Sequence, residues 1–219
     1  MKERQYFIAL DQGSSSSRAL AVDVVGHIAF ASQIPIKIIQ RGPGLVEHDP
    51  LDIARTQEMA LDHVLSRLPR NSKVLGLGIA CQRSTVVFWD RKTGRPIGRA
   101  LSWQDNRADG LAESLQDQKE SIHHRTGLYP TPFYSAPKIH WLLQNNRAAR
   151  QLAGQGRLIA APVATYLIWR LTRGALFACD PTLAQRTLLL NLKSLSWDPE
   201  LLKTFSIPRE ILPEILPSV

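Results

Sequence analysis

Four side chains able to do chemistry each follow a short segment that could be a buried strand. They are Asp11, Arg83, Trp103 and Asp180. Ligand sites in open α/β sheets gather outside the carboxyl ends of the strands. These four positions are therefore the first candidates for a functional site.

Asp11 opens a polar turn that continues through Gly13 and the serines Ser14–Ser17. A carboxylate at such a turn can hold a hydrated magnesium ion, while backbone N–H groups and hydroxyls point at phosphate oxygens. The pattern predicts a phosphate and magnesium site. The local sequence alone favours the alternative, an Asx-type turn that only closes a hairpin.

Arg83 and Trp103 have residue types that suit a hydroxylated ligand. The guanidinium of Arg83 can fork onto hydroxyl groups, although an ion pair with a nearby carboxylate is an equal alternative. The indole of Trp103 offers a flat wall and one N–H donor to a polyol. The alternative, which the local pattern favours, is a core tryptophan followed by Asp105 at a helix start.

Asp180 precedes Pro181 and could accept a proton from an attacking hydroxyl. The local pattern favours a plain helix N-cap with proline at the first helical position. The two cysteines, Cys81 and Cys179, are expected to be small core side chains. No histidine and cysteine cluster has the spacing of metal ligands.

Apolar periodicity and turn residues predict the elements that position these side chains. We expect a helix that starts at Pro50 and further helices over 106–119, 135–145 and 162–171. Residues 42–50 are expected to form a loop, and Gly154-Gln155-Gly156 is the one linker-like spot, too short to divide domains. Strands are expected over 6–10, 19–25, 28–34, 74–80, 85–89, 100–103 and 175–179. This order indicates an α/β fold with a mixed sheet.

Composition and charge exclude several classes of protein. The 219 residues are 44% hydrophobic and 21% charged, which suits one globular domain with a core. No apolar run is long enough to span a bilayer, and the N-terminus lacks the features of a signal peptide. The two cysteines lie far apart and predict no disulfide framework. We therefore expect a cytoplasmic protein with no membrane partner. The net charge of +8 comes from scattered residues. A nucleic-acid interface is not expected, whereas a polyanionic nucleotide fits the charge.

Taken together, the segments resemble the FGGY carbohydrate kinases, and among them the glycerol kinases, from Tyr6 to about Pro213. Each segment is a weak signal, but their order and spacing are specific. The matching segments are Leu10–Arg18, Val46–Pro50, Cys81–Arg83, Trp89–Gly94, Trp103–Asp105 with Arg107, Thr126–Tyr129, Ser135-Ala136 with Lys138, Leu167–Trp169 and Arg186–Leu189.

The resemblance implies an actin-like, ribonuclease-H-like α/β domain with a mixed β-sheet flanked by helices. Residues 1–219 would be the N-terminal, substrate-binding domain of an ATP-dependent polyol or sugar kinase, and the C-terminal nucleotide-binding domain is absent from this chain. The implied cofactors are ATP and Mg²⁺, with Asp11 as the metal residue and Asp180 as the catalytic base. The implied phosphate-binding residues are Gly13, Ser14, Ser15 and Arg18. The implied substrate-binding residues are Arg83, Ser84, Trp103, Phe133, Tyr134 and Asp180.

Several positions depart from the glycerol kinase pattern. Ser84 stands where those enzymes carry glutamate, and Phe133-Tyr134 reverses their usual order of the two aromatic residues. Losing one strong polar contact costs on the order of 1–3 kcal/mol of discrimination. These departures leave the alcohol open: we expect a kinase of this family that acts on a polyol or sugar, with glycerol as one of the candidates.

The expected partners are a small polyol or sugar and the chain's own C-terminal domain, with a homo-oligomer left open. The isolated chain is expected to be nearly inactive, because one domain cannot close a cleft over ATP. The alternative function is a non-catalytic sensor of the same fold that binds a sugar or nucleotide, and drift at Ser84, Phe133 and Pro181 motivates it. A basic nucleic-acid-binding module is the third alternative, and it requires salt-dependent binding to DNA or RNA.

Overall fold

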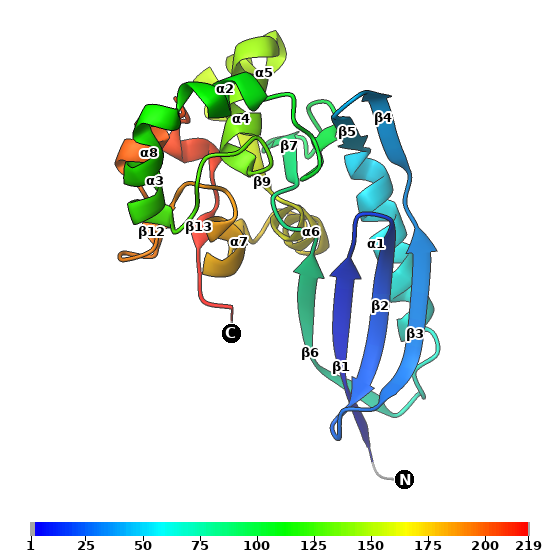
Figure 1. Cartoon of the computed structure of the whole chain (residues 1–219). Helices are drawn as coiled ribbons and strands as arrows, with labels where there is room; N and C mark the ends of the chain where they lie inside the picture. Colours follow the sequence, from blue (N-terminus) through cyan, green and yellow to red (C-terminus); the bar gives the residue numbers. More distant parts are fainter. Residues whose placement is uncertain (1–2, 219) are drawn as a thin grey trace. The chain divides into compact units, whose positions relative to one another are not determined.

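The computed structural model describes residues 3–218 and divides into two compact units (Figure 1). Unit 1 comprises Met1–Ile38 and Asp49–Gln82, and unit 2 comprises Ile39–His48 and Arg83–Val219. The linker-like residues 154–156 lie inside unit 2, so they do not separate the units.

Unit 1 is a four-stranded mixed sheet with one long helix against it (Figure 1). The strand order is β3-β2-β1-β6, with β1 antiparallel to β2, β2 antiparallel to β3, and β1 parallel to β6. The elements are β1 (Arg4–Gln12), β2 (Ser16–Asp23), β3 (Ile28–Pro35), α1 (Pro50–Leu65) and β6 (Ser72–Cys81). The predicted antiparallel meander, the helix that starts at Pro50 and the strand after it are confirmed.

Helix α1 starts where the sequence predicts because its first turn is capped. The carboxylate of Asp49 accepts a hydrogen bond from the backbone N–H of Leu51 at 3.0 Å, and Pro50 needs no such partner. Ala60 and Val64 of the helix pack against the buried face of β1, which includes Ile8. Nearer the sheet end that carries Asp11, Oγ of Ser17 lies 2.9 Å from Oγ1 of Thr56, and the side-chain amide of Gln57 donates to the carbonyl of Arg18 at 2.8 Å.

Unit 2 contains a five-stranded sheet in the order β4-β5-β8-β7-β9. Its strands are β4 (Ile38–Gly42), β5 (Leu45–His48), β7 (Val86–Asp90), β8 (Ala100–Leu101) and β9 (Leu158–Pro162). All residues of β7 and β9 are buried, and the two strands pair antiparallel. They form the centre of this unit.

Helices and short strand pairs complete unit 2. The helices are α2 (Asp109–Ser114), η1 (Gln116–Gln118), α3 (Lys119–Thr126), α4 (Ser135–Asn145), α5 (Arg147–Gly154), α6 (Val163–Leu171), α7 (Pro181–Gln185), α8 (Pro199–Thr204) and η2 (Arg209–Ile211). The short strands are β10 (Ala178–Cys179) paired with β13 (Glu214–Ile215), and β11 (Leu190–Asn191) paired with β12 (Ser196–Trp197). Within the described residues, no helix has the length and apolar character needed to cross a membrane.

Three predictions about elements are wrong. Residues 42–50 are not all loop, because Val46 in β5 donates its N–H to Asp105 and accepts from the N–H of Ser102. The helix over 106–119 is broken into α2 and η1, and the strand over 175–179 shortens to β10. In the first case the pairing partners lie far away in the sequence, where local periodicity gives no signal.

An aromatic cluster fills the core beside β7. The ring of Trp89 meets those of Tyr166, Trp169 and Phe177 at centroid distances of 5.1, 5.8 and 6.1 Å. Trp89 is fully buried. Large rings in such contacts contribute much of the apolar area that stabilises a core.

We expect Trp89→Ala to lower the free energy of unfolding by about 3–5 kcal/mol, because it removes a buried ring and leaves a cavity. Trp103→Ala is the matched control, since Trp103 is 42% exposed and its loss should cost about 0.5 kcal/mol or less. Urea unfolding followed by circular dichroism measures both. Equal losses in the two variants would contradict the placement of Trp89 in the core.

The carboxyl group of Asp90, at the end of β7, is expected to make the free energy of unfolding depend on pH. Hydrogen bonds from Arg157 are the largest cause that lowers the pKa of Asp90 to about 2, from an ordinary value of 3.8. A lowered carboxyl pKa stabilises the folded state above the unfolded value, and this contribution is lost as the pH falls from about 4 to 2. We expect Asp90→Asn to be less stable than the natural chain at pH 7, with a difference that narrows below pH 4. Thermal unfolding across that range measures the difference, and a gap that stays constant would rule out the ion pair as its source.

Candidate functional site

The predicted phosphate turn lies between β1 and β2 in unit 1. The N–H of Gly13 donates to the carbonyl of Ser16 at 2.9 Å, which closes the turn. A Cβ added to Gly13 would lie 3.3 Å from that carbonyl oxygen, so any other residue here would require the oxygen to shift slightly. The sequence turn predicted from Asp11 to Ser17 is confirmed at its centre, although Asp11 and Gln12 still belong to β1.

Two buried glutamines hold this turn, and sequence analysis did not identify them as site residues. The side-chain amide of Gln82 donates to the side-chain oxygen of Gln12 at 3.0 Å and to the carbonyl of Gly13 at 3.1 Å. Gln12 itself donates to the carbonyl of Gly13 at 2.7 Å. One signal for them was present in the sequence: Gln12 ends one apolar segment and Gln82 directly follows another. These two segments become the parallel neighbours β1 and β6.

Asp11 and Arg18 face each other across the hairpin. Nη1 of Arg18 lies 3.3 Å from Oδ2 of Asp11, and the two side chains are 48% and 44% exposed. An ion pair with this exposure is weak, so it does not lock either group against a ligand. The turn therefore offers an accessible carboxylate, an accessible guanidinium and a tight backbone bend.

This set fits a magnesium nucleotide in one specific way. No group of three His, Cys, Asp or Glu side chains within residues 3–218 could hold a metal ion by itself. Mg²⁺ commonly takes one or two protein carboxylates and completes its shell with water and phosphate oxygens. Asp11 fits as such a single ligand, and the Gly13 turn with Ser14, Ser15 and Arg18 fits the phosphates.

Ser84 occupies a constrained position in unit 2. Its φ angle of 64° is in the left-handed region, which costs a residue with a Cβ about 1–2 kcal/mol. Its hydroxyl donates to the carbonyl of Arg186 at 3.2 Å, and its own carbonyl accepts from the hydroxyl of Ser135 at 3.3 Å. Ser84 is only 7% exposed, so its main visible role is to tie these segments together.

Trp103 and Arg83 present their side chains to solvent. The exposure of Trp103 contradicts the alternative of a core tryptophan, and its backbone N–H donates to Oγ1 of Thr85 at 3.0 Å. Arg83 is exposed, and the salt bridges found among residues 3–218 do not include it. Both side chains are thus exposed on the surface of unit 2.

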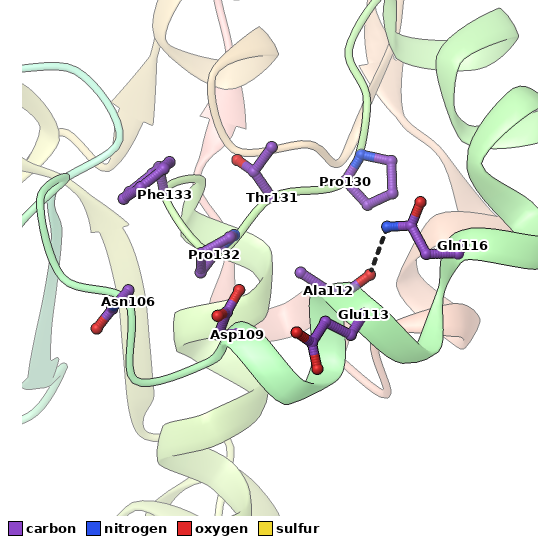
Figure 2. Close-up of a pocket in the computed structure, with 9 residues that line it drawn as sticks. All are labelled: Asn106, Asp109, Ala112, Glu113, Gln116, Pro130, Thr131, Pro132 and Phe133. Carbon is purple, nitrogen blue, oxygen red and sulfur yellow. Dashed lines mark hydrogen bonds between the residues drawn. The ribbon is translucent and has the colours of Figure 1, made fainter. Parts of the chain in front are cut away.

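Phe133 and Tyr134 lie on the loop before α4. Phe133 is 47% exposed and lines a pocket of about 300 Å³ between this loop and α2, which Figure 2 shows. The ring of Tyr134 lies under the guanidinium of Arg186, 4.8 Å from its centroid. Of the predicted substrate residues, Phe133 alone lines that pocket. The other lining residues are Asn106, Asp109, Ala112, Glu113, Gln116, Pro130, Thr131 and Pro132.

Asp180 is the N-cap of α7. Its Oδ1 accepts from the N–H of Leu183 at 3.1 Å, and its Oδ2 accepts from the hydroxyls of Thr182 at 2.6 Å and Ser218 at 2.8 Å. Burial opposes the charged form, but these hydrogen bonds outweigh it and lower the pKa of Asp180. A carboxylate engaged in this way is a weaker proton acceptor than a base tuned to neutral pH. The contacts favour the capping role.

The candidates fall into two sets. The phosphate and metal candidates share one turn of unit 1. In unit 2, hydrogen bonds and a ring contact join Ser84, Ser135, Arg186 and Tyr134. The backbone N–H of Trp103 donates to Thr85, the residue that directly follows Ser84. The partners that Asp180 contacts are outside the substrate set.

Comparison with known proteins gives a family match over residues 6–219, to the N-terminal domain of the FGGY family of carbohydrate kinases. The chain is 42% identical over 214 residues to a glycerol kinase of Paraburkholderia phytofirmans, and 42% identical over 219 residues to one of Shewanella baltica strain OS195. The alignments cover 96% and 99% of the chain, but 43% and 44% of the relatives.

Solved structures agree with the family match. The crystal structure of Plasmodium falciparum glycerol kinase with ADP superposes with a TM-score of 0.92 at 32% identity, over 97% of this chain and 43% of that one. The gluconate kinase of Lactobacillus acidophilus, at 23% identity and a TM-score of 0.84 over 97% of this chain and 42% of its own, shares the fold. The predicted actin-like, ribonuclease-H-like α/β fold is thus confirmed, and the chain belongs to the FGGY family of carbohydrate kinases.

Proposed function

We propose that this chain is the substrate-binding part of an ATP-dependent kinase that phosphorylates an alcohol group of a polyol or sugar in the cytoplasm. The observation that carries the proposal is 42% identity to glycerol kinases along almost the entire chain. The turn at Gly13 supports it, because its tight backbone and flanking charges suit phosphate groups.

The residues of unit 1 take the nucleotide side of this proposal. ATP would supply the phosphoryl group, and Mg²⁺ would neutralise its charge. Asp11 would contribute one oxygen to the metal, Gly13, Ser14 and Ser15 would donate to phosphate oxygens, and Arg18 would add positive charge after leaving Asp11. Phosphoryl transfer depends mainly on such positioning and charge neutralisation.

The residues of unit 2 take the alcohol side. The exposed rings of Trp103 and Phe133 suit the apolar faces of a polyol or sugar, and Arg83 can donate two hydrogen bonds to its hydroxyls. Ser84 offers a short hydroxyl already bonded to Arg186, in place of the glutamate expected in glycerol kinases. We therefore propose that the choice between glycerol and another polyol or sugar depends on this position.

A second domain is part of the proposal. The chain spans 43–44% of the length of the two glycerol kinases, so more than half of their length has no counterpart in it. A nucleotide-binding C-terminal domain in that part would close over ATP and exclude water. The chain by itself is then expected to bind substrate but turn over slowly.

We expect saturable ADP release with magnesium-ATP and one member of a panel of glycerol, pentitols and ketoses. The assay uses the protein as the cell makes it, including any polypeptide after Val219. Asp11→Ala should reduce turnover more than Asp23→Ala. Asp23 is the matched control, because its carboxylate lies at the end of β2 that is farther from the Gly13 turn. A compound that binds without turnover would instead support the non-catalytic sensor, and the absence of both binding and turnover would contradict the kinase.

Asp180 is the proposed base, and its capping role can be measured separately. Asp180→Ala should lower the free energy of unfolding by about 0.5–2 kcal/mol, whereas Asp180→Asn should cost much less, since asparagine caps equally well. If Asp180 is the base, turnover of Asp180→Asn should fall by about 10²–10⁴-fold. Turnover within a few-fold of the natural protein would show that Asp180 only caps α7 and that another group accepts the proton.

A further inference from the structure

Lys138, in the first turn of α4, carries a buried amine. Its side chain is 0% exposed, and Nζ donates to the backbone carbonyl of Phe133 at 2.5 Å. Lysine is almost never fully buried unless it is paired. The bond reaches back over the start of the helix to the loop that carries the exposed ring of Phe133.

Three further charged side chains make Lys138 part of a buried charge cluster, defined here as Glu47, Asp105, Arg107 and Lys138. Arg107 lies 2.8 Å from both Glu47 and Asp105, and Asp105 has no exposure to solvent. Burial lowers the pKa of Lys138 to about 7, while the charge of Asp105 raises it and that of Arg107 lowers it. The two carboxylates and two basic groups thus balance in charge when Lys138 is protonated.

The cluster connects two loops that carry candidate substrate residues. Asp105 and Arg107 hold the segment that follows Trp103, because Asp105 accepts hydrogen bonds from the backbone and guanidinium of Arg107. The guanidinium of Arg107 also lies over the ring of Trp141 in α4, 4.8 Å from its centroid. Lys138, on the same helix, holds the other loop at Phe133.

That second loop has little regular structure to fix it. Residues 130–134 form no helix or strand, and Pro130 and Pro132 have no N–H to donate. Figure 2 shows Pro130, Thr131, Pro132 and Phe133 on the loop at one side of the pocket, and Asp109, Ala112 and Glu113 of α2 at the other. A strong donor at the carbonyl of Phe133 therefore has a direct effect on where the ring of Phe133 lies.

We propose that Lys138 is a positioning residue that fixes the loop 130–134 and thereby orients Phe133 and Tyr134 for the alcohol substrate. The part concerning the substrate rests on the proposed function, whereas the part concerning the loop does not. Lys138 acts through the carbonyl of Phe133. The competing explanation is that the amine only stabilises unit 2 as a whole.

Lys138→Met separates the two explanations, because methionine keeps an unbranched apolar stem and removes the donor. Backbone ¹⁵N relaxation should show order parameters at Phe133 and Tyr134 that fall from about 0.85 to below about 0.6. The amides of α6 should not change. Lys119→Met, at an exposed lysine at the start of α3, is the matched control and should leave both regions unchanged.

Two results would overturn the proposal. Order parameters at Phe133 and Tyr134 that stay within error of the natural chain would show that Lys138 does not fix the loop. A loss of order spread evenly over unit 2 would support the purely stabilising role. If Lys138→Met does not fold, the natural chain still gives a test: a scalar coupling between Nζ of Lys138 and the carbonyl carbon of Phe133 is expected, and its absence would refute the contact.

Kinetics tests the consequence for the substrate. With the alcohol that the ADP assay identifies, Lys138→Met should raise KM by about tenfold through the lost charged hydrogen bond, with a smaller change in kcat and in the KM for ATP. Lys138→Arg should restore part of the KM. A tenfold fall in kcat with KM unchanged would contradict a positioning role. If the natural protein turns over no alcohol, the proposed function fails, while the relaxation result still decides the role of Lys138 in the loop.

Discussion

A carboxylate that is wholly shielded from water, that of Asp105, organises much of unit 2. Burying such a charge is tolerated only when it is paired and fully hydrogen-bonded. Asp105 meets this condition by accepting from the backbone of Val46 at 2.7 Å and from both backbone and side chain of Arg107. These bonds hold β5 against the segment that carries Trp103, and Arg107 extends the contact to Glu47 and α4.

In each unit, local hydrogen bonds hold the backbone next to the candidate site residues. In unit 1, two buried glutamines join the ends of parallel strands to the Gly13 turn by hydrogen bonds, while Asp11 and Arg18 beside the turn remain exposed. In unit 2, exposed rings stand on loops whose backbones are held from beneath by buried polar groups. Preorganising a binding surface in this way avoids the cost of ordering it when a ligand arrives.

Similarity to a family and geometry carry different information about a residue. The family match covers Ser84 and Asp180 equally, yet the structure shows both side chains in hydrogen bonds within the chain, at Arg186 for the first and in the cap of α7 for the second. Trp103 and Phe133 show the opposite case, because their rings are exposed at the surface. Burial and hydrogen bonding thus rank the candidates in a way that the motifs alone did not.

The sequence by itself determined the elements whose signal is local. The meander of β1 to β3, the capped start of α1 and the helices α4 and α6 follow from apolar periodicity, turn residues and proline positions within each segment. Only the tertiary structure decided the short strands β5 and β9, since their stability comes from pairing with β8 and β7 across distant parts of the chain. The same reason applies to Gln12, Gln82 and Lys138: all three belong to segments that match the family, but the acceptors of their hydrogen bonds are brought to them only by folding.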